Sequence, residues 1–483
     1  MTTTAYVFPP RPGLTEAEMR AVIAPVGPFE TGLEHSEAVF RQMIAASAQP
    51  ARAQEALASV LAETGRADEA LTLYRAVLKA EPWNRTALER LIFTLDLSPT
   101  TTDTEARIWR HEWWRHFGIP AIARDRPLSN DRTPDRVLRV GYLSGDFRHH
   151  SAALAFWSVV LRHSSQIQPV CYSTILPADH DVATVNFQKG TEWHDVADLS
   201  ELALADKIRA DRIDVLVDCA AFTPGNRLVT FCEHPAPIQI TAWGYATGLG
   251  MPACDVLFSD VVLRGSSDRV AERVVTLPCV IPWGPPSSIP AIADRVDGPP
   301  TFGAFHRLSK VNADVLAVWA RVLDAVPDAQ LICKGAQYME PSVQRWITAA
   351  VGPRVRFLPT TSHHDHLQAL SQIDVMLDPW PQTGGVTTCE CLWMGVPVVT
   401  WIGPRMIQRA SASILLHVGL SQCITDSADS YVERAAALVQ NQPWLNDQRA
   451  TLRARLELSA ICSGYVETVE AAYRRLWRAW CAA

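Results

Sequence analysis

From residue 137 onward, short apolar runs alternate with stretches of helical periodicity, and this alternation constrains the fold more than any other feature of the chain. The first apolar runs lie at 137–143, 170–175, 213–219, 238–243 and 256–258. Runs of this length are typical of strands that are buried on both faces of a parallel sheet, and helical patterns between them, such as 200–209, supply the crossovers. We therefore predict a doubly wound α/β domain over residues 137–285.

A proline-rich break at 282–300 precedes a second series of the same kind. Its apolar runs lie at 301–305, 331–334, 355–358, 375–377 and 396–401, and its helical patterns at 312–326, 341–350, 363–372, 387–394 and 409–418. This series predicts a second α/β domain with terminal helices over residues 300–483, facing the first across a cleft. Ligands bind beyond the carboxyl ends of the strands in such sheets, so the residues that follow strands are the candidates for a site.

The chain before residue 137 follows a different pattern. Residues 1–33 form a lead-in rich in Pro and Gly, residues 34–118 have helical periodicity, and residues 119–136 form a linker. One helical unit resembles a tetratricopeptide repeat (TPR), and its matching residues are Leu57, Ala58, Leu61, Gly65, Ala70, Tyr74 and Pro82. A single repeat cannot bury a continuous core, so we expect helices around 38–48 and 85–95 to complete the layer.

The helical stretch also predicts how the chain meets its partners. Trp109, Trp113 and Trp114 are expected to dock the helical layer onto the domain that follows. Helical repeats generally present surfaces that bind proteins. We therefore expect residues 34–118 to bind a protein partner as an adaptor separate from the nucleotide-binding domains.

Charge and cysteine usage exclude several functional classes. The net charge is −7 and no dense basic run occurs, which argues against nucleic acid and anionic membranes as partners. The eleven cysteines include no C-x-x-C pair, which argues against a disulfide framework or a zinc site and favours a reducing cytoplasm. Neither a secretory leader nor an apolar run of about 18 residues is present, so membrane insertion is not expected.

The strongest signal for a site is the segment from Asp378 to Gly395. A strand ends in the glycine pair Gly384 and Gly385 and leads into a helix that begins with Thr387 and Thr388. Backbone N–H groups, hydroxyl groups and the positive end of the helix can together bind a phosphate, and Glu390 could accept hydrogen bonds from ribose hydroxyls. The alternative is a capped helix start whose glycines serve only a tight turn.

Two further candidates follow the first strand of each domain. Lys310, after the strand at 301–305, could neutralise a leaving diphosphate, or it could be a solvated lysine before a helix. His150, after the strand at 137–143, could face the cleft and transfer a proton near neutral pH, or it could be structural.

Two other polar clusters fit metal binding poorly. His363, His364 and His366 lack the spacing and the carboxylate of a zinc site, which leaves nucleotide contact or solvent exposure. Asp179 and Asp181 form an Asp-x-Asp sequence within a polar loop, whose composition favours a surface turn over a metal clamp. We therefore predict that the site holds no metal.

Taken together, these segments resemble the catalytic region of the protein O-linked N-acetylglucosaminyltransferases, a family that bears tetratricopeptide repeats and includes related protein O-fucosyltransferases. The resemblance is co-linear from about residue 137 to residue 483. It rests on 138–142, 146–150, 235–239, 305–310, 385–400 and Arg409 with Ser413 and Leu415.

The resemblance implies a metal-independent, inverting transferase of the GT-B fold, a pair of Rossmann-like domains. The donor would be UDP-GlcNAc or another nucleotide-sugar and the acceptor Ser or Thr of a protein; no cofactor is implied. By position, His150 matches the active-site histidine and Lys310 the diphosphate lysine. The residues that match or flank the donor site are Arg307, His366, Gly384, Gly385, Thr387, Thr388 and Glu390.

The chain also departs from the family pattern. Phe222 stands where relatives typically carry a histidine, which replaces a polar group with an apolar ring near the expected cleft, and His306 and Arg307 replace amides before Lys310. Two alternatives remain. One is a non-catalytic TPR scaffold with a degenerate glycosyltransferase fold, which the presence of Lys310 disfavours. The other is transfer to lipid or small-molecule glycans, which the helical repeats disfavour.

Overall fold

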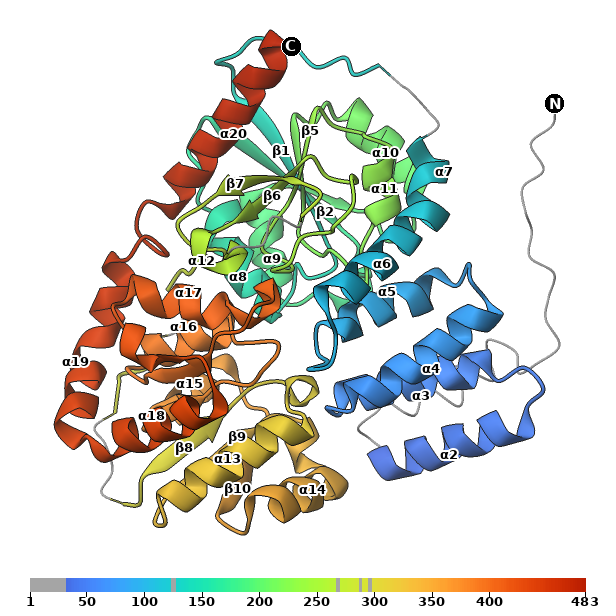
Figure 1. The fold of residues 1–483 in the computed structure, drawn as a ribbon. Coiled ribbons are helices and arrows are strands. Elements are labelled where there is room, and N and C mark those ends of the chain that lie inside the picture. Colours follow the sequence, from blue (N-terminus) through green and yellow to red (C-terminus); the bar gives the residue numbers. More distant parts are fainter. Residues whose placement is uncertain (1–31, 123–126, 266–269, 286–288, 294–297) are drawn as a thin grey trace.

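The computed structural model describes residues 32–122, 127–265, 270–285, 289–293 and 298–483. An N-terminal helical region precedes two α/β halves, each of which is built on one parallel sheet (Figure 1). The predicted fold class, a pair of Rossmann-like domains preceded by a short all-α region, is therefore confirmed. Most of the predicted lead-in, residues 1–31, lies outside the described residues, as do residues 123–126 of the predicted linker.

The helical region contains the predicted repeat. Its helices are α2 (Leu33–Ala46), α3 (Ala51–Glu63), α4 (Ala67–Ala80), α5 (Arg85–Leu95), α6 (Asp103–Trp113) and α7 (Ile119–Ile122), with a π-helical turn at Trp114–Gly118 before α7. Ala58 of α3 and Ala70 of α4 are fully buried, so the two helices approach closely. Tyr74 fills the space beside them, and its hydroxyl lies 3.0 Å from the Ser59 hydroxyl.

The first half has a seven-stranded sheet in the order β3-β2-β1-β4-β5-β6-β7. Its strands are β1 (Leu138–Ser144), β2 (Ile167–Ser173), β3 (Glu192–Asp195), β4 (Val215–Asp218), β5 (Ile238–Thr241), β6 (Val256–Ser259) and β7 (Arg273–Thr276). Its helices are α8 (Ser151–Val160), α9 (Val182–Gly190), α10 (Glu201–Ala210), α11 (Leu228–Cys232) and α12 (Val261–Arg264). Each adjacent pair of strands is parallel.

The second half repeats this plan with the strand order β10-β9-β8-β11-β12-β13. Its strands are β8 (Thr301–Ala304), β9 (Gln330–Lys334), β10 (Val355–Leu358), β11 (Val375–Leu377), β12 (Val398–Trp401) and β13 (Ile424–Thr425). Its crossover helices are α13 (Ala313–Ala325), α14 (Pro341–Val351), α15 (His363–Leu370), α16 (Val386–Trp393) and α17 (Ala410–His417). All five of these helices match predicted helical patterns.

Three helices follow: α18 (Ala428–Gln440), α19 (Gln442–Leu458) and α20 (Tyr465–Ala482). Figure 1 shows α20 running back along the first half, although the sequence places it after the second. Tyr473 and Trp477 of α20 are fully buried in the same apolar cluster as Val140 of β1. The Tyr473 hydroxyl lies 3.2 Å from that of Tyr142, so the first half is completed by a segment distant in sequence.

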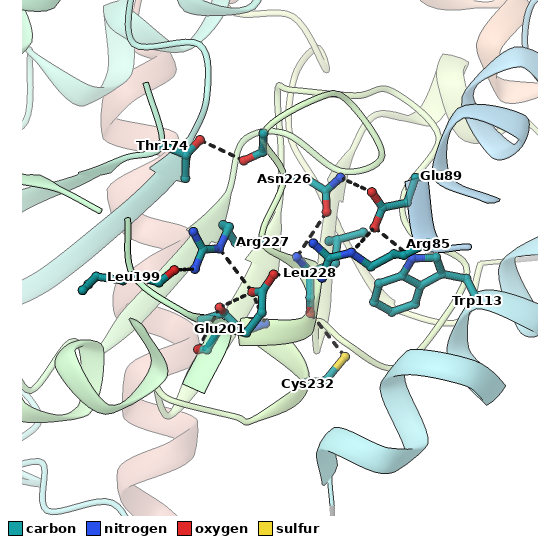
Figure 2. A network of polar contacts seen from close by, with 12 residues as sticks. Arg85, Glu89, Trp113, Thr174, Leu199, Glu201, Asn226, Arg227, Leu228 and Cys232 are labelled. Atoms are coloured by element: carbon teal, nitrogen blue, oxygen red, sulfur yellow. Dashed lines mark hydrogen bonds and ion pairs between the residues drawn. The ribbon is translucent and has the colours of Figure 1, made fainter. Parts of the chain in front are cut away.

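The helical region is fastened to the first half by a polar network (Figure 2). Glu89 of α5 accepts hydrogen bonds from Asn226 Nδ2 at 3.0 Å and from Trp113 Nε1 at 3.1 Å. Trp113 is fully buried, which confirms its predicted docking role. Phe222 belongs to this interface, because its ring is buried with its centroid 6.3 Å from that of Trp113. The structure thus places Phe222 against the helical region, which explains an apolar ring at this position.

A single carboxylate joins the helical region to both halves. Asp96, which follows α5, is 2% exposed. Its oxygens accept hydrogen bonds from Arg405 Nη2 of the second half at 2.5 Å and from the Tyr245 hydroxyl of the first half at 2.8 Å. Arg110 of α6 adds a third contact at 3.1 Å. The helical region is therefore built into the junction of the two halves.

The turn between α3 and α4 also touches the second half. Gly65 has φ +78°, and a Cβ atom there would lie 1.9 Å from the Val311 carbonyl oxygen. Only glycine permits this approach, which places the helical region directly behind the loop that follows β8.

Within the described residues, no helix combines the length and apolarity needed to span a bilayer.

Candidate functional site

In each sheet, predicted site residues follow central strands, between which the strand order reverses direction. The reversal lies between β1 and β4 in the first half and between β8 and β11 in the second. Loops that diverge at such a point leave a crevice in which ligands bind. The loop after β1 carries His150, the loop after β8 carries Lys310, and the loop after β11 carries Gly384 and Gly385.

A buried carboxylate holds the glycine-rich turn in place. Asp378, which directly follows β11, accepts hydrogen bonds from Gly384 N at 2.7 Å and from Thr400 Oγ1 at 2.6 Å. Burial raises the pKa of Asp378 to about 6, although these hydrogen bonds act in the opposite direction. A Cβ atom on Gly384 would lie 2.4 Å from Thr388 Oγ1, so the turn is too tight for any other residue.

The open side of the turn consists of the first residues of α16. Gly385 caps the helix, and Gly385, Val386 and Thr387 are half-buried. The N–H groups of this first turn and the Thr387 hydroxyl form a surface suited to an anion. Thr388 is fully buried, and its hydroxyl lies 2.8 Å from Ser411 Oγ. Of the two predicted hydroxyls, Thr387 thus lies at the open surface and Thr388 braces the turn.

Lys310 meets the glycine-rich turn. It ends the 3₁₀ turn Leu308–Lys310, and its Nζ donates a hydrogen bond of 2.9 Å to the Thr383 carbonyl oxygen. Burial and, to a smaller extent, the nearby Arg307 charge lower the pKa of Lys310 to about 7, and Asp378 opposes both effects. A lysine in this position gains its full charge when an anion binds beside it.

Glu390, which is predicted to accept hydrogen bonds from ribose hydroxyls, contacts two histidines. It is 6% exposed, and its oxygens lie 2.8 Å from His363 Nε2 and 3.6 Å from His366 Nε2. Burial favours a higher pKa for Glu390, but the hydrogen bonds to both histidines outweigh it and lower the pKa to about 2. Lys334 Nζ, at the end of β9, lies 3.4 Å from His366 Nδ1. The predicted His366 is therefore oriented by a carboxylate and an ammonium group.

His150 stands at the corresponding place in the first half. Its Nδ1 caps α8 by accepting a hydrogen bond from Ala152 N at 3.2 Å, and it lies 3.3 Å from Asp146 Oδ1. Burial lowers the pKa of His150, and Asp146 acts against that change. Burial also raises the pKa of Asp146, which is 6% exposed. This pair can orient or exchange a proton with a hydroxyl group that enters the cleft.

The two halves contact each other beside these groups. The rings of His149, after β1, and His363, at the start of α15, have centroids 5.7 Å apart. Arg307 carries a positive charge that lowers the pKa of both Lys310 and His150. The structure therefore brings His150 of one half and Lys310 of the other to the same junction between the halves, where the charge of Arg307 acts on both.

Sequence reasoning assigned no role to three buried groups of this site. Asp146 and Asp378 each directly follow a strand or its first turn, which is a signal that could have identified them. His306 is 3% exposed, and neither of its ring nitrogens has a hydrogen-bond partner among the described residues. Burial first, and then the charge of Lys310, lowers the pKa of His306 to about 3, so its ring is neutral.

The clusters considered for metal binding have other roles. Asp181 caps α9 by accepting a hydrogen bond from Thr184 N at 3.0 Å, so the Asp-x-Asp sequence lies at a helix start. His363 contacts Glu390, as described above. Across the described ranges, no three His, Cys, Asp or Glu side chains gather in a group able to hold a metal ion.

Comparison with known proteins identifies matching families for both parts of the chain. The model of glycosyl transferase family 41 matches residues 124–277 and 297–468, and a tetratricopeptide repeat model matches residues 51–94. A solved structure of a Thermobaculum terrenum O-GlcNAc transferase mutant shares 30% identity with the chain, with a TM-score of 0.88 over 97% of this chain and 94% of that one.

Plant proteins are similar over most of this chain. The Solanum lycopersicum protein SPINDLY, named a probable UDP-N-acetylglucosamine–peptide N-acetylglucosaminyltransferase, is 32% identical over 84% of this chain and 45% of its own length. Arabidopsis thaliana SEC, which bears the same activity name, is 27% identical over 76% of this chain and 40% of its own length. The chain thus spans less than half the length of these curated relatives. Since the family model covers both α/β halves and the tomato relative aligns with most of the chain, this protein belongs to glycosyl transferase family 41.

Proposed function

We propose that the protein transfers a sugar from a nucleotide-sugar, UDP-GlcNAc or a related donor, to Ser or Thr of a protein acceptor. The observation that carries the proposal is the contact of Lys310 with the glycine-rich turn, at a junction where the charge of Arg307 also acts on the His150–Asp146 pair of the other half. The names of the similar plant and bacterial proteins support the same reaction. A scaffold without activity would have no use for a half-buried lysine that contacts the glycine-rich turn.

The second half is suited to the donor. When the bond from sugar to diphosphate breaks, negative charge develops on the leaving diphosphate. Lys310, Arg307 and the first turn of α16 place positive charge and N–H donors around that position, with the Thr387 hydroxyl beside them. This charge makes a divalent ion unnecessary, so we propose metal-independent transfer. We assign His366, which Glu390 and Lys334 contact, to the nucleoside end of the donor.

The first half is suited to the acceptor. Inversion requires the hydroxyl group to attack the sugar from the face opposite to the diphosphate. His150 projects from the half that faces Lys310, and Asp146 lies beside its ring. We assign His150 to the acceptor hydroxyl or the sugar, where its loss affects the chemical step more than the binding of nucleotide.

The helical region is proposed to bind the acceptor protein. A cavity of about 590 Å³ lies between the helical region and α13 and α14 of the second half. Its walls include Leu33, Glu37, Asp68 and Trp346, so both apolar and charged groups line it. The eleven cysteines are all free thiols, which supports the cytoplasm as the compartment.

A donor screen tests the proposal. The protein is incubated with a panel of UDP- and GDP-sugars and co-expressed proteins, with and without EDTA, and the acceptors are examined by intact mass. We expect one sugar mass on a protein acceptor, at a rate that EDTA leaves unchanged. Binding of neither UDP nor GDP would favour a scaffold, and sugar found only on lipid or free glycans would contradict a protein acceptor.

A further inference from the structure

The cleft arginine Arg307 has little to hold it within its own half. Its side chain is exposed, and its Nη2 lies 3.4 Å from Gln382 Oε1, which is a long hydrogen bond. A second contact comes from the helical region: the guanidinium carbon lies 5.8 Å from the centroid of the Phe93 ring. A guanidinium within about 6 Å of an aromatic centroid is attracted to the ring face.

Phe93 is fixed on the face of α5 that docks onto both halves. Arg85, Glu89, Phe93 and Asp96 follow one another at intervals of four, four and three residues, which places them on one side of the helix. Arg85 contacts Glu201 at 2.9 Å, Glu89 contacts Asn226, and Asp96 contacts both halves. Figure 2 shows the Arg85 and Glu89 end of this face.

The Phe93 ring is also held from the side of the first half. Its centroid lies 5.5 Å from that of Tyr245, and the two planes are inclined by 41°. The Tyr245 hydroxyl is bonded to Asp96, one turn beyond Phe93. The ring is thus held by one half and offers a contact to an arginine of the other.

Arg307 is close enough to the reacting groups for its orientation to matter. Its charge acts on Lys310 in its own half and on His150 and Asp146 in the opposite half. An arginine in this place can bind a diphosphate through two parallel hydrogen bonds, provided that its plane is fixed.

We propose that Phe93 is a positioning residue for the donor: it holds the guanidinium of Arg307 toward the diphosphate, so the helical region contributes to the nucleotide site. This inference rests on the proposed function, because it requires a diphosphate to bind at the Lys310 turn. Phe93 itself does not contact the donor in this proposal. Its effect passes through Arg307 alone.

Calorimetric titration of the full chain tests the proposal. UDP and GDP are titrated into the parent protein, and the one that binds more tightly is then compared with its free nucleoside. Phe93→Leu should weaken binding of the diphosphate about threefold to tenfold, the range that a partly exposed cation–π contact supports. Binding of the nucleoside should be unchanged, and Phe93→Tyr, which keeps a ring, should restore parent affinity.

A double-mutant cycle separates positioning from a general effect on folding. In an Arg307→Gln background, Phe93→Leu should have no further effect, because the group that Phe93 holds is gone. The matched control is Phe117→Leu, which removes a ring that lies 5.6 Å from Trp113 in the same region. This control should leave diphosphate affinity unchanged.

The outcomes are distinct. Equal weakening by Phe93→Leu with and without Arg307, or full affinity in the Phe93→Leu protein, would overturn the inference and leave the proposed function intact. If the parent protein binds neither UDP nor GDP, the proposed function fails and the inference fails with it.

Discussion

At the scale of single residues, the two cations beside the glycine-rich turn contact neutral groups. Lys310 donates to a carbonyl oxygen, and Arg307 contacts an amide oxygen and an aromatic ring. Asp378, the carboxylate that holds the turn, accepts a hydrogen bond from Gly384 N on one oxygen and from Thr400 Oγ1 on the other. An anionic donor can therefore pair with both cations.

Lys310→Ala should slow transfer about a hundredfold, because removing one preorganised contact to developing charge costs about 3 kcal/mol in the transition state. Single-turnover transfer measured at saturating donor checks this. Lys189→Ala, at an exposed lysine of α9, is the control and should react at the parent rate. A normal rate for Lys310→Ala would mean that the lysine does not face the diphosphate.

The affinity for a nucleoside diphosphate should fall as the pH rises above 7. The pKa of Lys310 is lowered from 10.5 to about 7, so the lysine of the free protein is cationic below pH 7 and loses its proton above it. Because the diphosphate binds the cation, binding at pH 8 should take up a proton. Calorimetry in two buffers of different ionisation enthalpy measures this uptake. Lys310→Arg, which stays charged, should abolish it, and equal uptake by that variant would exclude Lys310 as the source.

His150→Ala should abolish or severely reduce transfer while nucleotide affinity stays within a few fold of the parent value. The reason is that His150 projects from the half opposite to the glycine-rich turn. Single-turnover transfer and nucleotide titration, each with and without EDTA, check both parts. His35→Ala, at an exposed histidine of α2, is the control. Transfer at the parent rate without His150 would remove its role, and loss of transfer in EDTA would contradict metal independence.

At the scale of elements, the interior strands of the first sheet were predictable and its edge strands were not. β4, β5 and β6 are buried along their whole length, so each leaves a continuous apolar run in the sequence. β3 and β7 lie at the two edges of the sheet and are half-exposed. Their residues include Glu192 and Arg273, so their sequence shows no apolar run.

The site shows the same division between local and distant signals. The loops after β1, β8 and β11 could be identified because each follows an apolar run, and they carry His150, Lys310 and Gly384. Phe93 and Asp96 could not be identified, because the residues of the two halves that they contact are more than 100 positions away along the chain. The pairing of Glu390 with His363 likewise depends on how α15 packs beside α16, which no local pattern encodes.

Asp96→Ala should destabilise the protein by about 3–5 kcal/mol, the usual cost of removing one partner from a buried ion pair. Arg405 and Arg110 would each lose a carboxylate in a position with little access to water. Urea denaturation measures the change. The matched control is Asp135→Ala, whose pair with Arg478 at 2.6 Å is exposed and should contribute at most about 1 kcal/mol. Equal effects of the two variants would contradict the burial of the junction.

At the scale of the whole molecule, the apolar core does not divide at the boundaries between the parts. One buried cluster includes Leu57 of the helical region, Leu216 of the first half and Leu331 of the second. The polar contacts of Asp96 lie where these parts meet. The helical region is thus part of the same packed unit as the sheets.

We therefore expect the three parts to unfold together. Differential scanning calorimetry should give one transition, with a calorimetric enthalpy close to the van't Hoff enthalpy, although chains of several domains commonly unfold in steps. The Asp96→Ala protein provides the comparison, since a weakened junction should separate or broaden the transition. An early transition of the helical region in the parent protein would show that it folds independently.

The position of α20 has a consequence for how the protein is made. On the ribosome, domains generally fold as they emerge, the N-terminal ones first. Here the strands of the first half emerge early, yet Tyr473 and Trp477, which cover part of one face of their sheet, are translated only after the entire second half. That apolar face stays open in the nascent chain, where a chaperone can bind it. The half that is translated first is therefore the half whose folding is completed last.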